Sequence, residues 1–143
     1  MTVSIILAGK GRDVVTIEPN ATIADAARLL AERRIGAVVI LGADHRIVGI
    51  LSERDIVRAL AESGRDALDR PVSEAMTRKV STCHERETIS AIMERMTVGK
   101  FRHIPVVDQG RLVGIISIGD VVKHRLSEVE RDSAAMRDYI LTA

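Results

Sequence analysis

The sequence predicts a mixed α/β (α+β) fold built from two copies of one unit, each with the order strand, helix, strand, strand, helix. Residues 47–57 read IVGILSERDIV, and residues 112–122 read LVGIISIGDVV, which repeats the first segment in kind and order. Because self-similarity at a fixed period marks a structural unit used more than once, this repeat organises the chain. The residues that recur at an offset of 65 are Val48, Gly49, Ile50, Ser52, Asp55 and Val57, matched by Val113, Gly114, Ile115, Ser117, Asp120 and Val122.

The repeat extends upstream of this signature, into a short leading turn and a first strand. Residues 3–7 and 72–76 are corresponding lead-ins, and the first copy carries extra residues around Lys10 before its strand. The matched positions, 66 residues apart, are Val14, Thr16, Thr22 and Ile23 with Val80, Thr82, Thr88 and Ile89.

The first helix of each unit is identified by an apolar stripe at helical spacing. We expect helices over residues 22–34 and 88–98, because apolar residues three and four apart lie on one face of a helix. Methionines at this spacing are assigned to the core. The stripes are Ile23, Ala26, Ala27 and Leu30, and Ile89, Ile92, Met93 and Met96.

Two short β-branched runs follow each helix and predict a hairpin. The runs are residues 37–41 with 47–51 and residues 103–107 with 112–116. Residues 61–71 are polar and end at a proline, which cannot continue a helix, so they are the predicted linker.

The last helix is predicted to run from Gly119 past Ile140, longer than its counterpart and amphipathic. Such a helix packs on its own domain or on a partner subunit. The chain is thereby divided into a first unit with its lead-in and linker (residues 1–66), a second unit (67–128) and a helical tail (129–143).

Composition and charge exclude several classes of function. The 143 residues carry 21 Lys and Arg against 20 Asp and Glu, with the two signs interspersed, so no nucleic-acid partner is expected. Phe101 and Tyr139 are the only aromatic residues, so a bound base should lie between aliphatic side chains. No apolar stretch approaches the length of a membrane span, and one cysteine fits a reducing compartment. We expect a soluble, cytoplasmic protein without a membrane partner.

A serine followed three residues later by an aspartate closes the strand-to-helix junction of both units. One interpretation is a capping box, in which Ser52 or Ser117 accepts from first-turn N–H groups and Asp55 or Asp120 stabilises the helix start. The other is a ligand site, because helix N-termini at such junctions bind anions. The two roles are compatible.

The residues do not indicate catalysis. The four histidines lack metal-ligand spacing, and Cys83 falls on a predicted buried strand, where a thiol is a poor nucleophile. No Ser-His-Asp arrangement is visible. We predict no enzyme, no catalytic residue, no metal site and no catalytic cofactor.

The tandem unit resembles the paired CBS-domain module, also called a Bateman module. The resemblance is carried by Gly-hydrophobic-hydrophobic-Ser-x-x-Asp at the end of each copy and by RHIPVV at residues 102–107, and it covers nearly the whole chain. It is greatest to the free-standing bacterial proteins made of little else. The resemblance implies two units packed about a pseudo-twofold axis, with two clefts that bind AMP, ADP, ATP, NAD or S-adenosylmethionine. It implies a sensor, not a catalyst.

For the first cleft, the resemblance implies that Asp55 binds the ribose, because a carboxylate can accept from both hydroxyls of a vicinal diol. The family's clefts are composite, so this acid should face residues 80–82 and 102–104 of the second unit. Arg54, Arg102 and His103 are the candidate phosphate contacts, with solvated surface charge as the alternative. The implied binding residues are Ser52, Arg54, Asp55, Val80, Ser81, Thr82, Arg102, His103 and Ile104.

For the second cleft, the implied ribose-binding acid is Asp120, facing strands of the first unit. The backbone of those strands should read the adenine edge. Lys10 lies between two glycines and is the candidate phosphate contact there, although this triplet lacks the P-loop pattern. The implied residues are Lys10, Thr16, Ile17, Gly36, Ala37, Val38, Ser117 and Asp120.

The copies differ where phosphate would bind. Gly119 stands where the first unit has Arg54, and Ile118 stands where it has Glu53. The clefts should therefore bind unequally, and the Asp55 cleft is the expected phosphate-binding one.

These observations predict a regulatory module that binds AMP, ATP or NAD(H) between its units and transmits occupancy to an effector protein, with a homodimer as the expected assembly. The alternative is a structural dimerisation module whose clefts stay empty. The repeat fits both functions. The structural alternative does not explain an aspartate at both junctions together with basic residues near one of them.

Overall fold

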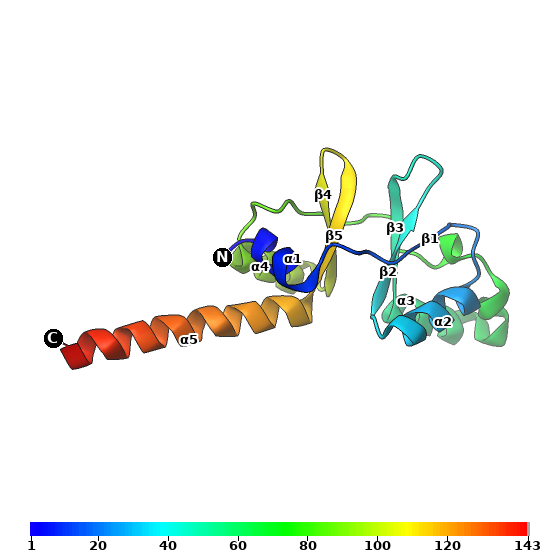
Figure 1. Ribbon diagram of the computed structural model, residues 1–143. Helices are drawn as coiled ribbons and strands as arrows, with labels where there is room; N and C mark the ends of the chain where they lie inside the picture. The colour runs from blue at the N-terminus through cyan, green and yellow to red at the C-terminus, as the bar shows by residue number, and fades with distance from the viewer. Residues whose placement is uncertain (143) are drawn as a thin grey trace.

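The computed structural model describes residues 1–142 and confirms the predicted pair of α/β units. The units lie side by side with their hairpins at the centre, and the last helix extends away from the second unit (Figure 1). The elements are α1 (Val3–Lys10), β1 (Thr16–Ile17), α2 (Ile23–Arg33), β2 (Ala37–Leu41), β3 (Ile47–Ser52), α3 (Glu53–Ser63), the 3-10 helices η1 (Gly64–Asp69) and η2 (Val72–Glu74), α4 (Ile89–Gly99), β4 (His103–Asp108), β5 (Arg111–Ser117) and α5 (Ile118–Thr142).

The first unit is a three-stranded sheet packed against two helices. β1 pairs parallel with β2, and β2 pairs antiparallel with β3. The hydroxyl of Thr22 accepts a hydrogen bond from the Asp25 N–H at 3.1 Å, so the start of α2 is capped. The buried residues that α2, α3 and the sheet contribute to the core are Ile23, Ala26, Leu30, Val38, Ile40, Leu51 and Ile56.

The second unit repeats this arrangement with a shortened first strand. β4 pairs antiparallel with β5, while the strand predicted before α4 is a single parallel bridge from Cys83 to Val106. The Cys83 N–H donates to the Pro105 oxygen, and the Val107 N–H donates to the Cys83 oxygen. The segment therefore lies beside β4 as a strand would, but it pairs over one residue only.

The two lead-in segments are exchanged between the units. α1 is an eight-residue helix that buries Val3, Ile6 and Leu7 in the core of the second unit, although it precedes the first unit in the sequence. η2 buries Val72 in the core of the first unit. The chain then crosses from α1 to the strands of the other unit (Figure 1). Residues 1–10 were assigned to the first unit because they precede it in the chain. In the structure, the apolar face of α1 packs against the core of the second unit.

Two glycines of the repeat allow the lead-ins to approach the sheets. A Cβ atom at Gly114 would lie 2.6 Å from Cδ2 of Leu7 in α1. A Cβ atom at Gly49 would overlap the sulfur of Met76 and lie 3.1 Å from the Thr77 oxygen. A larger side chain at either position would force the facing side chain or the lead-in to shift, so close approach explains why glycine recurs here.

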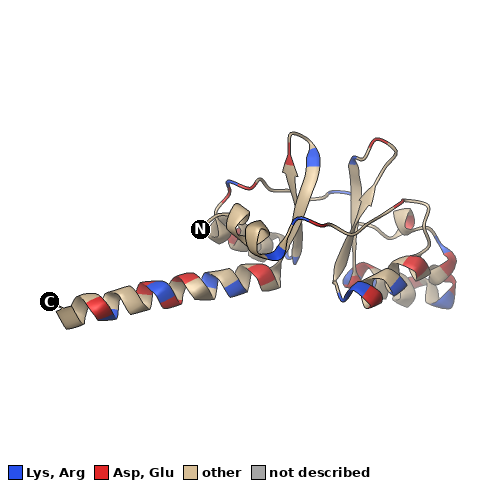
Figure 2. Cartoon of the chain, in the orientation of Figure 1, with Lys and Arg blue, Asp and Glu red and all other residues tan. Residues whose placement is uncertain are grey.

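α5 is 25 residues long and begins directly after β5. Charges of both signs are distributed along it (Figure 2). Several of its apolar side chains are exposed, in contrast to those of α2 and α4 that lie in the cores. Within residues 1–142, no helix has the length and apolar character needed to traverse a bilayer.

Gly114→Ala should lower the free energy of unfolding by about 1–3 kcal/mol, because the added methyl overlaps Leu7 in a packed core. Urea denaturation of the purified variant measures this loss. Gly9→Ala is the matched control, since no atom lies within 4 Å of a Cβ at that helical position. Equal stabilities of the two variants would contradict the close approach described here.

Candidate functional site

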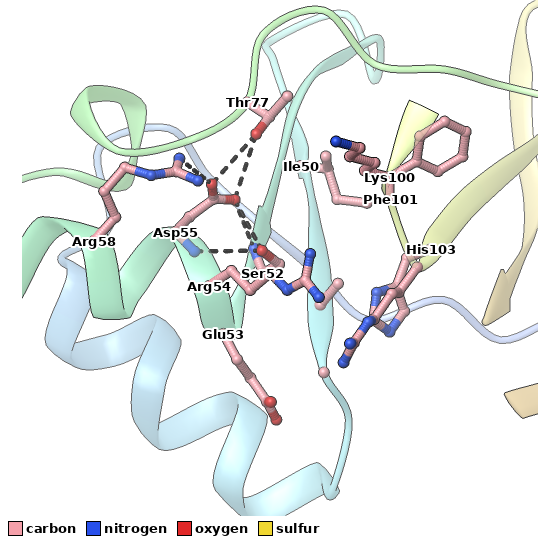
Figure 3. A pocket seen from close by; sticks show the side chains of 13 residues that line it. Ile50, Ser52, Glu53, Arg54, Asp55, Arg58, Thr77, Lys100, Phe101 and His103 are labelled. Carbon is pink, nitrogen blue, oxygen red and sulfur yellow. Dashed lines mark hydrogen bonds and ion pairs between the residues drawn. The ribbon is translucent and has the colours of Figure 1, made fainter. Parts of the chain in front are cut away.

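A cavity of about 240 Å³ lies between the two units, at the start of α3. It brings together residues of the first unit and the segment that leads into β4 of the second (Figure 3). The lining residues are Gly36, Ala37, Ile50, Ser52, Glu53, Arg54, Asp55, Arg58, Thr77, Lys100, Phe101, Arg102 and His103.

Asp55 is the buried charged side chain of this cavity, with 5% of its surface exposed. Its Oδ2 accepts from the Ser52 N–H at 2.9 Å and from the Ser52 hydroxyl at 3.1 Å. The Asp55 N–H donates to the side-chain Oγ atom of Ser52 at 3.3 Å. The predicted capping box is therefore present, and it holds the carboxylate rigidly at the cavity wall.

The other partners of Asp55 are weaker. Arg58 donates to Oδ1 at 3.2 Å, but the arginine side chain is 64% exposed. The Thr77 hydroxyl lies 3.4 Å from the same oxygen. Exposed ion pairs contribute little because water screens them and the long side chain stays mobile. One side of the carboxylate is thus fixed by the helix cap, and the other side has exchangeable partners.

Basic side chains surround the opening of the cavity. Arg54 comes from the start of α3, whereas Lys100 and Arg102 come from the segment between α4 and β4. All three residues are exposed, and Glu53 is the acidic residue among them. A helix N-terminus also carries partial positive charge, so this opening favours anions.

His103 lies at the junction of the two units. Its ring packs so closely on Gly36 that a Cβ there would lie 3.0 Å from the ring Cε1 atom. Burial lowers the pKa of His103 below its ordinary value; Glu53 opposes this shift and Lys10 adds to it. The imidazole is therefore neutral at pH 7 and offers one donor and one acceptor.

Asp120 occupies the equivalent position in the second unit. Its Oδ2 accepts from the Ser117 N–H at 2.9 Å and from the Lys10 ammonium at 2.8 Å. Lys10 also donates to the Ile115 oxygen at 3.0 Å. Burial opposes the ionisation of Asp120, but the hydrogen bonds from Lys10 and Ser117 outweigh it and hold the pKa of Asp120 below its usual range.

The predicted site residues are distributed unevenly. Ser52, Arg54, Asp55, Arg102 and His103 come together as expected in the first cavity. Lys10, Ser117 and Asp120 also come together, in the second unit.

Other predicted residues lie elsewhere. Gly36 and Ala37 were expected to face Asp120, but they line the Asp55 cavity, because the loop before β2 lies against His103. Val38 and Ile104 are fully buried in the two cores. Ile17 packs on the first core, Thr16 and Thr82 line an open groove between the hairpins, and Val80 and Ser81 lie outside the Asp55 cavity.

Sequence reasoning missed several lining residues. Thr77 follows the lead-in of the second unit, so its place beside Asp55 depends on the exchange of lead-ins. Lys100 and Phe101 directly precede the RHIPVV run, which was the available signal. Phe101, one of the two aromatic residues of the chain, lines this cavity together with aliphatic side chains, and the position of a bound base stays a prediction.

Comparison with known proteins identifies the family. The CBS domain model matches residues 11–62 and 72–127. The chain belongs to the CBS-domain family. A crystal structure of a CBS-domain-containing protein from Agrobacterium tumefaciens has a TM-score of 0.85 and 51% identity to this CBS pair, covering 87% of this chain and 92% of the other. The resemblance inferred from the repeat is thereby confirmed.

Two further solved CBS structures hold ligands. A CBS domain protein from Pyrobaculum aerophilum, complexed with AMP, has a TM-score of 0.75 and 33% identity and covers 84% of this chain and 89% of its own. The CBS domain pair of the protein MJ0100, with 5′-methylthioadenosine and S-adenosyl-L-methionine, has a TM-score of 0.80 and 29% identity, with coverages of 90% and 98%. The chain spans 66% of a curated relative from Acidianus ambivalens, to which it is 39% identical.

Within the described residues, no three His, Cys, Asp or Glu side chains are placed to hold a metal ion. Cys83 is 1% exposed, and burial raises the pKa of its thiol to about 12. A thiol of this kind is protonated at neutral pH and reacts slowly.

Cys83 should resist iodoacetamide at pH 8 in the folded protein and react fully in denaturant. Burial excludes the reagent, and the raised pKa keeps the thiolate fraction low. Mass spectrometry of intact protein after timed alkylation measures this. Rapid labelling under native conditions would show that the strand-like segment beside β4 is open.

Proposed function

We propose that this CBS pair is a regulatory module that binds a phosphate-bearing adenosine nucleotide, AMP, ATP or NAD(H), in the Asp55 cavity. The observation that carries the proposal is a composite cavity, in which a buried helix-start carboxylate of one unit faces basic residues of the other. The AMP complex of the Pyrobaculum aerophilum relative supports it.

The ribose would bind to the exchangeable side of Asp55. The cap from Ser52 uses part of the carboxylate, and a carboxylate has about four acceptor positions. The two hydroxyls of a ribose can replace the long Thr77 contact and the solvent-exposed Arg58 without disturbing the cap. Ribose binding would then break only these weak contacts and would keep the hydrogen bonds of the helix cap.

The phosphate would lie at the opening, among Arg54, Lys100 and Arg102. Guanidinium and ammonium groups beside a helix N-terminus favour phosphate oxygens. The same charges oppose a cationic sulfonium ligand, so a nucleotide is favoured over S-adenosylmethionine for this chain. Ile50, Ala37 and Phe101 provide apolar wall for the base.

Occupancy would pass to a partner through α5, within a homodimer. Val122, Leu126, Val129, Met136 and Ile140 are exposed on α5 at 42%, 57%, 52%, 60% and 66%. Their spacing of four, three, seven and four residues follows the 3.5-residue period of a helix that packs along another helix. We therefore assign this apolar seam to a second copy of the chain. The buried thiol supports a reducing, cytoplasmic location as part of the same proposal.

A structural dimerisation module with unoccupied clefts is the second candidate, and the apolar seam of α5 is the observation that favours it. The seam serves both functions equally. Nucleotide binding at the Asp55 cavity distinguishes them.

Isothermal titration with AMP, ATP, NAD, NADH and S-adenosylmethionine at one salt concentration tests the ligand class. The phosphate-bearing compounds should bind, and Arg54→Ala should weaken them about 10-fold, the usual effect of losing one charge-assisted hydrogen bond. Arg86→Ala is the control, since Arg86 is exposed and lies outside the cavity. Absence of heat for every compound would favour the structural module.

Leu126→Asp should convert the dimer to a monomer, because a charge in the middle of the seam opposes helix packing. Light scattering after gel filtration measures the mass. Val98→Asp places the same charge on an apolar residue of α4 that is 77% exposed, and it should leave the dimer intact. A monomeric wild-type protein would remove this part of the proposal.

A further inference from the structure

The two helix-start acids are built in the same way. Asp55 and Asp120 each accept an N–H bond at 2.9 Å from the serine three residues earlier. Each aspartate N–H in turn donates to the side-chain Oγ atom of that serine, at 3.3 Å for Asp55 and 3.2 Å for Asp120. Besides the replacement of Arg54 by Gly119, a difference in binding between the two clefts can therefore come from the groups that face these carboxylates.

In the first unit, the group that the lead-in brings to the carboxylate is neutral, and the charged partner, Arg58, comes from α3 itself with its side chain 64% exposed. The Thr77 N–H donates to the Ile50 oxygen at 2.9 Å, which fixes the segment after η2 beside β3. The Thr77 hydroxyl lies 3.4 and 3.5 Å from the two oxygens of Asp55. Contacts of this length are weak, and the cavity lies open beside them.

In the second unit, an ammonium group takes the corresponding place. Lys10 is the last residue of α1, and its Nζ atom donates to the Ile115 oxygen at 3.0 Å and to Oδ2 of Asp120 at 2.8 Å. Ile115 is the repeat counterpart of Ile50. Lys10 therefore contacts both the carbonyl and the carboxylate that Thr77 contacts in the first unit, but it brings a charge.

The charge changes what a ligand must displace. A charge-assisted hydrogen bond is shorter and stronger than a neutral one. The lowered pKa of Asp120 agrees with a carboxylate that stays ionised and paired although burial opposes its charge. A ribose hydroxyl that approaches Asp120 would have to remove Lys10, whose side chain is 34% exposed and lies 2.8 Å from the carboxylate. At Asp55 it replaces the long contact with Thr77 and the 64% exposed Arg58 at 3.2 Å.

We propose that Lys10 is an internal occupant of the second cleft, which takes the place of a ribose hydroxyl on Asp120 and restricts nucleotide binding to the Asp55 cavity. This inference rests on the proposed nucleotide-binding function. It reverses the expectation that Lys10 binds a ligand phosphate. The chain then binds one nucleotide, and release of the end of α1 opens a second site.

The test is the number of ATP molecules bound per chain in calorimetric titration. Wild-type protein should show one site, and Lys10→Met, which keeps the aliphatic stem and loses the ammonium, should show two. Affinity of the Asp120 cleft for ATP should rise by about 10-fold or more in Lys10→Met relative to the wild type, in which this cleft is too weak to count as a site. Lys10→Met with Asp120→Ala should return to one site. Lys79→Met, at an exposed lysine outside the Asp55 cavity, is the matched control and should behave as wild type.

Two results would overturn the inference. One is a Lys10→Met variant that still binds one ATP while its Asp120 carboxyl titrates by NMR with a raised pKa, which shows that the freed acid is not a site. The other is a wild-type protein with two sites, one of which weakens in Lys10→Met, as a phosphate contact would. If wild type binds no ATP but Lys10→Met binds one, the proposed function of the Asp55 cavity fails and the role of Lys10 stands. If neither binds, both fail.

Discussion

The exchange of lead-in segments is the constraint on which the rest of this structure depends. α1 precedes the first unit in sequence but closes the core of the second unit. η2 precedes the second unit in sequence but closes the core of the first. Each core is therefore completed by the lead-in of the other unit. The chain must cross between the units twice (Figure 1). Gly49 and Gly114 allow the close approach. The relative position of the units, and hence the geometry of the cavity between them, follows from this packing.

The exchange of lead-in segments also places a polar side chain beside each of the two helix-start aspartates, Asp55 and Asp120. Ser52 and Ser117 cap α3 and α5 through local hydrogen bonds, and those caps orient the two carboxylates. Besides Arg58 of α3, which contacts Asp55, the group beside each carboxylate comes from the lead-in that belongs to the other unit in sequence: Thr77 at Asp55 and Lys10 at Asp120. A repeated unit therefore produces two electrostatically different clefts, through the residues between serine and aspartate in the signature and through the lead-in residues that face the carboxylates.

The Asp55 cavity joins a fixed acceptor to an exposed basic rim. The carboxylate is buried and held by a helix cap, whereas Arg54, Lys100 and Arg102 are exposed. Rigid acceptors suit a sugar, and adaptable cations suit phosphates of different length. Because α5 starts directly after Ser117, its orientation is coupled to the junction that carries the second acid.

The sequence by itself determined the repeat, the helix, hairpin and second helix of each unit, and the capping role of both Ser-x-x-Asp motifs, because periodicity and caps act over three or four residues. It did not show that the lead-in of the first unit is the helix α1 or that the linker contains a 3-10 helix. Only the tertiary structure decided that Gly36 lines the Asp55 cavity and that Lys10 pairs with Asp120 across 110 residues. Such contacts depend on how the two units pack. An apolar pattern shows that a face is buried, but it does not show which surface covers it.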